Sequence, residues 1–122
     1  MGGFGALRLA GQYPDRLAGA SAHSVITDLT ERDSMIEEPQ ARRVIDCLLR
    51  NRAILPPLRF DCGLGDALLA SNWTLHQALT SAGVGHIYEA FPGGHDWPYW
   101  SEHLSDSLKF LEAQLPSNQA FL

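Results

Sequence analysis

Phe91–Trp100 reads Phe-Pro-Gly-Gly-His-Asp-Trp-Pro-Tyr-Trp, a strand end followed by a glycine turn, a histidine and the start of a helix. The run with strand character is His86–Phe91, and a helical pattern covers Trp97–Leu115. The two glycines permit a sharp turn and leave space beside the imidazole of His95. A histidine held on a loop just past a strand is positioned to exchange protons with a substrate. The alternative is a loop histidine without such a task.

Two further strands are predicted upstream, at Leu17–Ser24 and Leu58–Cys62. The first is short, small and largely apolar, which is typical of a buried strand in a parallel sheet. Its polar end, His23-Ser24, is expected at the edge of the sheet formed by the strands' C-terminal ends. Open α/β sheets bind their ligands at that edge. We therefore expect His23 and Ser24 at the rim of a substrate pocket.

Segments with helical spacing alternate with these strands. They lie at the start of the chain, at Ala41–Arg50, at Asn72–Ala82 and at Trp97–Leu115. Such alternation predicts an α/β fold, with about three parallel strands and covering helices. The last helix is expected to bury a broad apolar side made of Trp100, Leu104, Leu108, Phe110 and Leu111.

Two segments have no strand pattern. Residues 24–52 are predicted to form either a helical insertion or a lid-like region over the pocket, and residues 116–122 a frayed tail. The remaining residues indicate one α/β domain, without internal repeats or low-complexity stretches.

Composition excludes several classes of protein. The 122 residues carry a net charge of −5 and scattered basic residues, which argues against a nucleic-acid partner. No apolar run approaches the length of a membrane span, so no membrane partner is expected. The two cysteines lack metal spacing, and a reduced, cytoplasmic location is the default. The five histidines form no zinc pattern, and no metal or cofactor is predicted.

Two of the strand ends carry Asp66 and then His95. This is the last part of a Ser…Asp…His order, in which the aspartate orients the imidazole and the imidazole takes the proton of the serine. The serine of such a triad stands on a Gly-x-Ser-x-Gly turn, and no segment of this chain matches that motif.

The opening residues account for the missing motif. Met1–Ala10, Met-Gly-Gly-Phe-Gly-Ala-Leu-Arg-Leu-Ala, closely resembles the segment directly after the nucleophile in the putative-esterase (esterase D-like) family of α/β-hydrolases. The resemblance continues through Tyr13–Arg16, Cys62–Asp66 and Gly93–Trp97, and so covers nearly the whole chain in the expected order. It implies the C-terminal part of a single α/β-hydrolase domain, beginning just after the nucleophilic serine.

The resemblance also implies roles for individual residues. Asp66 is the acid and His95 the general base, and the backbone amide of Met1 is one oxyanion-hole donor if Met1 is internal. As a free terminus, Met1 is an ammonium group and loses that geometry. Asp61 is less favoured as the acid because it stands inside a strand, and Asp96 because it is adjacent to His95. Trp97 is a further candidate for substrate contact, although aromatic residues at helical spacing more often belong to a core.

The functional hypothesis is a serine-type hydrolase of carboxylic esters or thioesters, with a small-molecule substrate. The alternative is a truncated, catalytically inactive remnant that acts only as a structural or interaction module. A ligand-binding protein that uses the cleft between Asp66 and His95 has no specific feature in its favour. The strand Leu17–Ser24 is expected to present an unpaired edge, which favours self-association.

Overall fold

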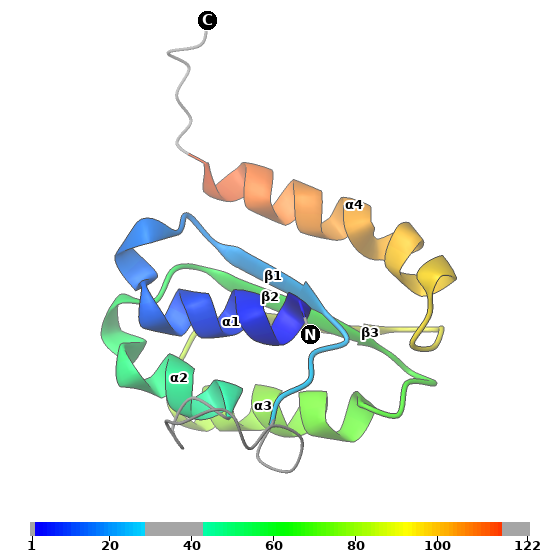
Figure 1. Cartoon of the computed structure of the whole chain (residues 1–122), viewed down its shortest axis with the longest axis horizontal. Coiled ribbons are helices and arrows are strands. Elements are labelled where there is room, and N and C mark those ends of the chain that lie inside the picture. The colour runs from blue at the N-terminus through cyan, green and yellow to red at the C-terminus, as the bar shows by residue number, and fades with distance from the viewer. Residues whose placement is uncertain (1, 29–42, 116–122) are drawn as a thin grey trace, which may run out of the picture.

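The structure is a computed structural model, and it describes residues 2–28 and 43–115 (Figure 1). Its sheet contains three strands, β1 (Ala20–His23), β2 (Leu58–Gly63) and β3 (Ile87–Phe91), in the order β1-β2-β3. Both pairings are parallel. The predicted α/β fold with three parallel strands is therefore confirmed.

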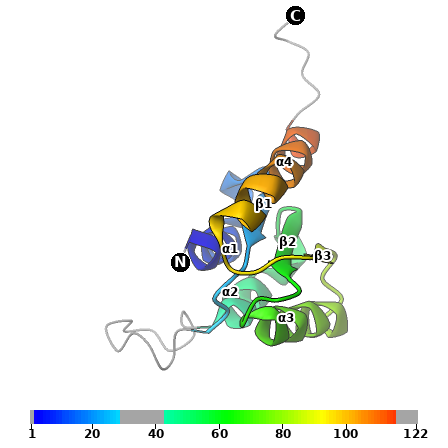
Figure 2. The same ribbon diagram turned by 90° about the vertical axis from the view of Figure 1, so that its right-hand side faces the viewer.

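Four α-helices alternate with the strands in the described residues: α1 (Gly2–Gln12), α2 (Val44–Arg50), α3 (Leu69–Ser81) and α4 (Trp97–Gln114). Short 3₁₀ turns come after α1 and α2, at Pro14–Arg16 and Arg52–Ile54. Helices α1, α2 and α3 cover one face of the sheet and α4 covers the other (Figures 1 and 2). None of these helices is both long and apolar enough to cross a membrane.

Two predicted boundaries were wrong. Strand β1 covers only Ala20–His23 because Ser24, with φ of 55°, has left the extended conformation. Helix α3 starts at Leu69, three residues before the predicted Asn72. The carboxylate of Asp66 accepts a hydrogen bond of 2.8 Å from the backbone N–H of Leu68, which satisfies a donor in the turn that leads into α3.

The hydrophobic core lies between the sheet and helices α1, α2 and α3. Successive side chains of a strand point to opposite faces, and the apolar set of β1 and β2 points to this side. The buried members of the core are Phe4, Leu7, Ala10, Ala20, Ala22, Val25, Val44, Leu48, Leu58, Phe60, Leu75, Leu79 and Val84. Helix α2, which falls within the predicted insertion 24–52, thus contributes to the body of the domain, and residues 29–42 lie outside the described residues.

The opposite face of the sheet is polar, and this overturns the prediction for the last helix. Helix α4 turns Tyr99, His103 and Ser107 toward the sheet, and all three side chains are buried. Tyr99 donates a hydrogen bond to Asp61, Ser107 bonds to Ser21 and His23, and His103 stacks on Phe91 of β3. Arg59 lies beside Ser21 and Asp61 on the same face. Since these groups need hydrogen-bond partners, the polar stripe of α4 packs inward. Leu104 and Leu108 consequently remain 53% and 58% exposed.

Candidate active site

The loops after β2 and β3 bring Asp66 and His95 together. Because β2 and β3 are parallel neighbours, their C-terminal ends meet at one edge of the sheet. Nδ1 of His95 lies 2.9 Å from Oδ2 of Asp66. The two residues selected from the sequence therefore form a hydrogen-bonded pair.

A direct contact between the two loops fixes their distance. The backbone N–H of Gly65 donates a hydrogen bond of 2.8 Å to the carbonyl of Gly93. The same carbonyl occupies the space that a side chain at Gly63 would need. Gly93 itself has φ of 131°, a conformation that side-chain-bearing residues rarely adopt. The glycines around Asp66 and before His95 thus let the loops approach closely enough for the pair to form.

The carboxylate of Asp66 is nearly buried, with 1% of its side chain exposed. Burial alone would raise its pKa, but hydrogen bonds from the Leu68 amide, from His95 and from Ser24 outweigh burial, and the pKa lies below the ordinary 3.8. Asp66 is therefore ionised at neutral pH and can only accept hydrogen bonds. It follows that Nδ1 of His95 carries the shared hydrogen, and Nε2 of the neutral ring is left as a proton acceptor.

His95 faces an open pocket of about 470 Å³. Half of its side chain, 49%, is exposed, so substrate and water can reach the ring. The pocket is lined by Gly2 and Gly3 from α1, by Ser21, Ala22, His23 and Ser24 from the β1 segment, and by His95, Trp97 and Trp100. All three residues expected to contact substrate, His23, Ser24 and Trp97, therefore share one pocket with His95. Met1 lies outside the described residues.

Asp61 and Asp96 have partners other than His95. Asp61 is fully buried, and it accepts hydrogen bonds from Tyr99 at 2.6 Å and from Arg59 at 2.7 Å. Asp96 caps α4 by accepting from the backbone N–H of Tyr99 at 3.0 Å. Each of the two carboxylates thus stabilises structure next to the site.

His23 lines the pocket and also contacts the buried network. Its Nε2 atom lies 2.7 Å from the hydroxyl of Ser107 on α4. Its Nδ1 atom lies 2.8 Å from Oδ2 of Asp61 but forms no hydrogen bond, because the oxygen is out of line with the ring N–H. The ring of His23 therefore lies between α4 and the buried carboxylate of Asp61.

Trp100 was expected in the core, yet its ring lies against His95. The two ring centroids are 4.9 Å apart and the planes meet edge to face, at 84°. The indole N–H of Trp100 donates a hydrogen bond of 3.2 Å to the hydroxyl of Ser24. The signal in the sequence was its position in the first turns of the helix that starts directly after His95.

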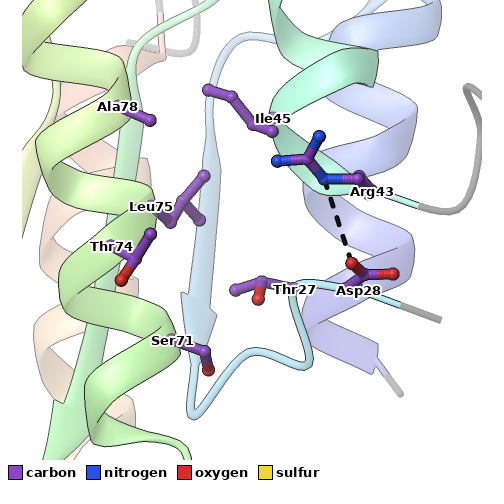
Figure 3. A pocket seen from close by; sticks show the side chains of 8 residues that line it. All are labelled: Thr27, Asp28, Arg43, Ile45, Ser71, Thr74, Leu75 and Ala78. Atoms are coloured by element: carbon purple, nitrogen blue, oxygen red, sulfur yellow. Dashed lines mark ion pairs between the residues drawn. The ribbon is translucent and has the colours of Figure 1, made fainter. Parts of the chain in front are cut away.

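A second pocket, of about 280 Å³, lies between α2, α3 and the segment after β1 (Figure 3). Three hydroxyl side chains, Thr27, Ser71 and Thr74, share it with the apolar Ile45, Leu75 and Ala78. Arg43 and Asp28 form an ion pair at 3.9 Å on one side of it (Figure 3). It shares no lining residue with the pocket of His95, and no histidine lines it.

Clusters that could hold a metal are absent from the described parts of the chain. Among residues 2–28 and 43–115, no three His, Cys, Asp or Glu side chains gather as a metal site requires. The chemistry that these residues can perform is proton transfer by an imidazole oriented by a carboxylate.

The chain is similar to several known esterases and hydrolases. An acetyl esterase from Caldicellulosiruptor saccharolyticus is 28% identical over 64 residues, which are 52% of this chain and 24% of that protein. The structure of a ferulic acid esterase superposes with a TM-score of 0.81 and 26% identity, over 95% of this chain and 49% of that one. The structure of FphF, a fluorophosphonate-binding serine hydrolase of Staphylococcus aureus, superposes with a TM-score of 0.80 and 21% identity. The match covers 90% of this chain and 50% of that one. At that identity the likeness to FphF shows the fold alone.

The chain thus spans about half the length of the matched structures and a quarter of the curated relative. The sequence profile of the family described as "Putative esterase" matches residues 1–111, nearly the whole chain. The chain therefore belongs to the putative esterase family.

Proposed function

We propose that this chain supplies the acid and the base of a serine-type hydrolase that acts on carboxylic esters or thioesters. The observation that carries the proposal is the hydrogen bond between Nδ1 of His95 and the buried carboxylate of Asp66, with the ring open to a pocket. An imidazole in this arrangement accepts a proton at Nε2 and is stabilised as imidazolium by the carboxylate. The family is described as putative esterases, and thioesters are proposed beside esters because both react by acyl transfer to a nucleophile.

The nucleophile belongs directly before Met1, in a chain that continues upstream with Gly-x-Ser. Such a serine would stand next to Gly2 and Gly3, which line the same pocket as His95. In the proposed reaction its Oγ attacks the carbonyl carbon of the substrate while its proton passes to Nε2 of His95. The tetrahedral intermediate then collapses, the bond to the leaving group breaks, and His95 returns the proton to the leaving oxygen or sulfur.

Deacylation repeats these steps with water as the nucleophile. His95 takes a proton from water, the hydroxide attacks the acyl carbon, and the serine leaves with the proton returned by His95. In both halves, negative charge develops on the carbonyl oxygen. The peptide N–H of Met1, when Met1 is internal, is proposed to stabilise that charge at the start of α1, where helix geometry leaves backbone N–H groups free.

Three pocket residues are proposed to contact substrate. His23 and Ser24 line the floor at the end of β1, and Trp97 extends from the start of α4. Trp97 is 76% exposed, which leaves a large apolar surface at the mouth of the pocket. Comparing kcat/KM for esters with acyl and alcohol groups of different length would show which groups these side chains prefer.

We also infer that the isolated chain self-associates. In the sheet order β1-β2-β3, the strand β1 has a neighbour on one side only among the described strands. Unpaired strand edges are templates for pairing with other chains. Helix α4 packs on β1, and its exposed Leu104 and Leu108 add apolar surface near this strand.

The catalytic proposal is tested in a longer protein that supplies the upstream half of the domain. That half ends in Gly-x-Ser directly before Met1. His95→Ala removes the proton acceptor, and we expect kcat to fall by several orders of magnitude. Asp66→Asn keeps the shape but favours the wrong tautomer, with a loss on the order of 10⁴-fold. Asp61→Asn and Asp96→Asn are the matched controls, because they alter carboxylates that contact other partners. Their effects are expected in stability more than in kcat.

Two results contradict the proposal. Retention of most activity in folded His95→Ala means that His95 is not the base. A loss in folded Asp61→Asn or Asp96→Asn as large as that in Asp66→Asn means that the acid is assigned wrongly. Circular dichroism of each variant separates loss of chemistry from loss of fold.

A further inference from the structure

His95 has few restraints of its own. Half of its side chain is exposed, and its hydrogen bond to Asp66 uses only one ring nitrogen. A ring held through a single nitrogen can still pivot about that bond. Catalysis requires Nε2 to point at a fixed place in the pocket, so a second contact on the ring is needed.

The ring of Trp100 provides such a contact. It meets the imidazole edge to face at a centroid distance of 4.9 Å, a favourable arrangement for two aromatic rings. The indole cannot rotate freely either, because its N–H donates to Oγ of Ser24 at 3.2 Å. The orientation of Trp100 is thus restrained by Ser24, the residue that follows β1.

Ser24 has an unusual backbone. Among the residues that the structure describes, it is the only one other than glycine with positive φ, at 55°. Its backbone N–H donates to the carbonyl of Asp61 at 2.8 Å, which holds the residue at the end of the strand ladder. Strained conformations of this kind persist where the surroundings enforce them, and they gather at functional sites.

The buried side chain of Ser24 also acts on the other member of the pair. Burial raises the pKa of Asp66, and the hydroxyl of Ser24 is one of the groups that outweigh burial and lower this pKa, after the larger effects of the Leu68 amide and His95. A hydroxyl has one hydrogen to donate and lone pairs to accept with. Ser24 can therefore accept from Trp100 and donate toward Asp66 at the same time.

We propose that Ser24 and Trp100 are positioning residues that together hold the imidazole of His95 in place against Asp66. The inference rests on the proposed function, since it concerns the same acid and base. It assigns Ser24 a task in orienting the site in addition to its proposed contact with substrate, and it assigns Trp100 to the site instead of the core. A residue that only fills space would tolerate loss of the indole N–H or of the serine hydroxyl.

The experiment observes the hydrogen between Nδ1 of His95 and Asp66 directly, by NMR of the full 122-residue chain labelled with ¹⁵N-histidine. Its rate of exchange with water reports how firmly the ring is held. In Trp100→Phe, which keeps a ring and removes the donor, we expect exchange to become about five- to tenfold faster, the factor for losing one hydrogen bond. Ser24→Ala is expected to have the same effect.

Ser24→Gly is the second variant at this position, in case Ser24→Ala fails to fold at a φ of 55°. Glycine removes the hydroxyl but adopts positive φ without strain, so the variant tests the hydroxyl with the backbone relaxed. Trp73→Phe and Ser105→Ala are matched controls, because Trp73 on α3 and Ser105 on α4 contact neither His95 nor Asp66 in the structure. Both controls should exchange at the original rate.

The outcomes separate the two proposals. If the Nδ1 hydrogen is protected in the unsubstituted chain, is lost in Asp66→Asn, and exchanges at the original rate in folded Ser24→Gly and Trp100→Phe, only the inference about Ser24 and Trp100 is overturned. If the hydrogen is unprotected in the unsubstituted chain, or unaffected by Asp66→Asn, the pair of acid and base fails and the inference fails with it.

Discussion

The hydroxyl of Tyr99 donates a hydrogen bond of 2.6 Å to Oδ1 of Asp61, and this bond joins α4 to the middle strand of the sheet. Tyr99 also contacts the loop that carries His95. Its backbone N–H bonds to the carboxylate of Asp96, and its ring lies against the backbone of Gly93. One residue of α4 therefore holds both a central strand and the loop of the candidate base.

Removing this hydroxyl should destabilise the fold. Tyr99→Phe keeps the ring but takes a donor from a fully buried carboxylate, so we expect the free energy of unfolding to fall by about 1–3 kcal/mol. Tyr13→Phe is the matched control, because Tyr13 is 44% exposed. Its effect should stay within about 0.5 kcal/mol, as for most surface substitutions. Equal urea-unfolding midpoints for the two variants would contradict the assigned role of Tyr99.

Stability should depend on pH through Asp61. Burial raises the pKa of Asp61, but the imidazole of His23 beside it and hydrogen bonds from Tyr99 and Arg59 outweigh burial and hold the pKa below 3.8. A carboxyl group whose pKa is lower in the folded state stabilises the fold above its unfolded value and loses this contribution as pH falls through the folded value. The free energy of unfolding should therefore decline below pH 3.8. The measurement is the free energy of unfolding from urea titrations at successive pH values. In Asp61→Asn this free energy should fall less steeply with decreasing pH. An unchanged pH dependence would contradict the assigned contribution of Asp61.

Gly63→Ala should separate the two loops of the site. A methyl group at this position collides with the carbonyl of Gly93, which also bonds to Gly65. Forced overpacking of this kind costs about 1–3 kcal/mol. Gly85→Ala is the control, since no atom lies within 4 Å of a Cβ there. We expect thermal unfolding at lower temperature for Gly63→Ala alone, and equal melting of the two variants would refute the collision.

The 122-residue polypeptide, expressed by itself, should show no esterase turnover. Its sequence has no serine in a Gly-x-Ser-x-Gly frame, and loss of the nucleophile leaves only weak residual catalysis even in an otherwise complete site. The assay is release of chromophore from a short-chain acyl ester, with His95→Ala as the reference. Turnover well above that reference would mean that another group acts as nucleophile.

The same polypeptide should self-associate. Light scattering is expected to report species larger than 13.4 kDa, since β1 and the outer side of α4 present an unpaired strand and exposed leucines. Leu104→Gln combined with Leu108→Gln should reduce association without lowering stability, because both side chains already face solvent. A sharp monomer peak for the unsubstituted chain, with a cooperative melt, would contradict the prediction.

Local sequence determined the order of elements and the composition of the two loops. The spacing of apolar residues predicts strands and helices, and Gly and Pro indicate turns. The parallel three-stranded architecture was therefore predictable. The same signals placed Asp66 and His95 on loops at strand ends. Both features depend on residues that are close in sequence, which is why the sequence contains them.

Only the tertiary structure decided which groups contact each other. The distance of 2.9 Å between His95 and Asp66 depends on how β2 and β3 align and on how closely Gly63 and Gly93 approach. Trp100 packs against His95 and donates a hydrogen bond to the hydroxyl of Ser24, so it contacts two residues that lie far apart in the sequence. Helical spacing identified a set of leucines on α4 but not the side of the helix that faces the sheet. Because the strands present polar groups to α4, hydrogen bonding turned Tyr99 and Ser107 inward and left Leu104 and Leu108 exposed.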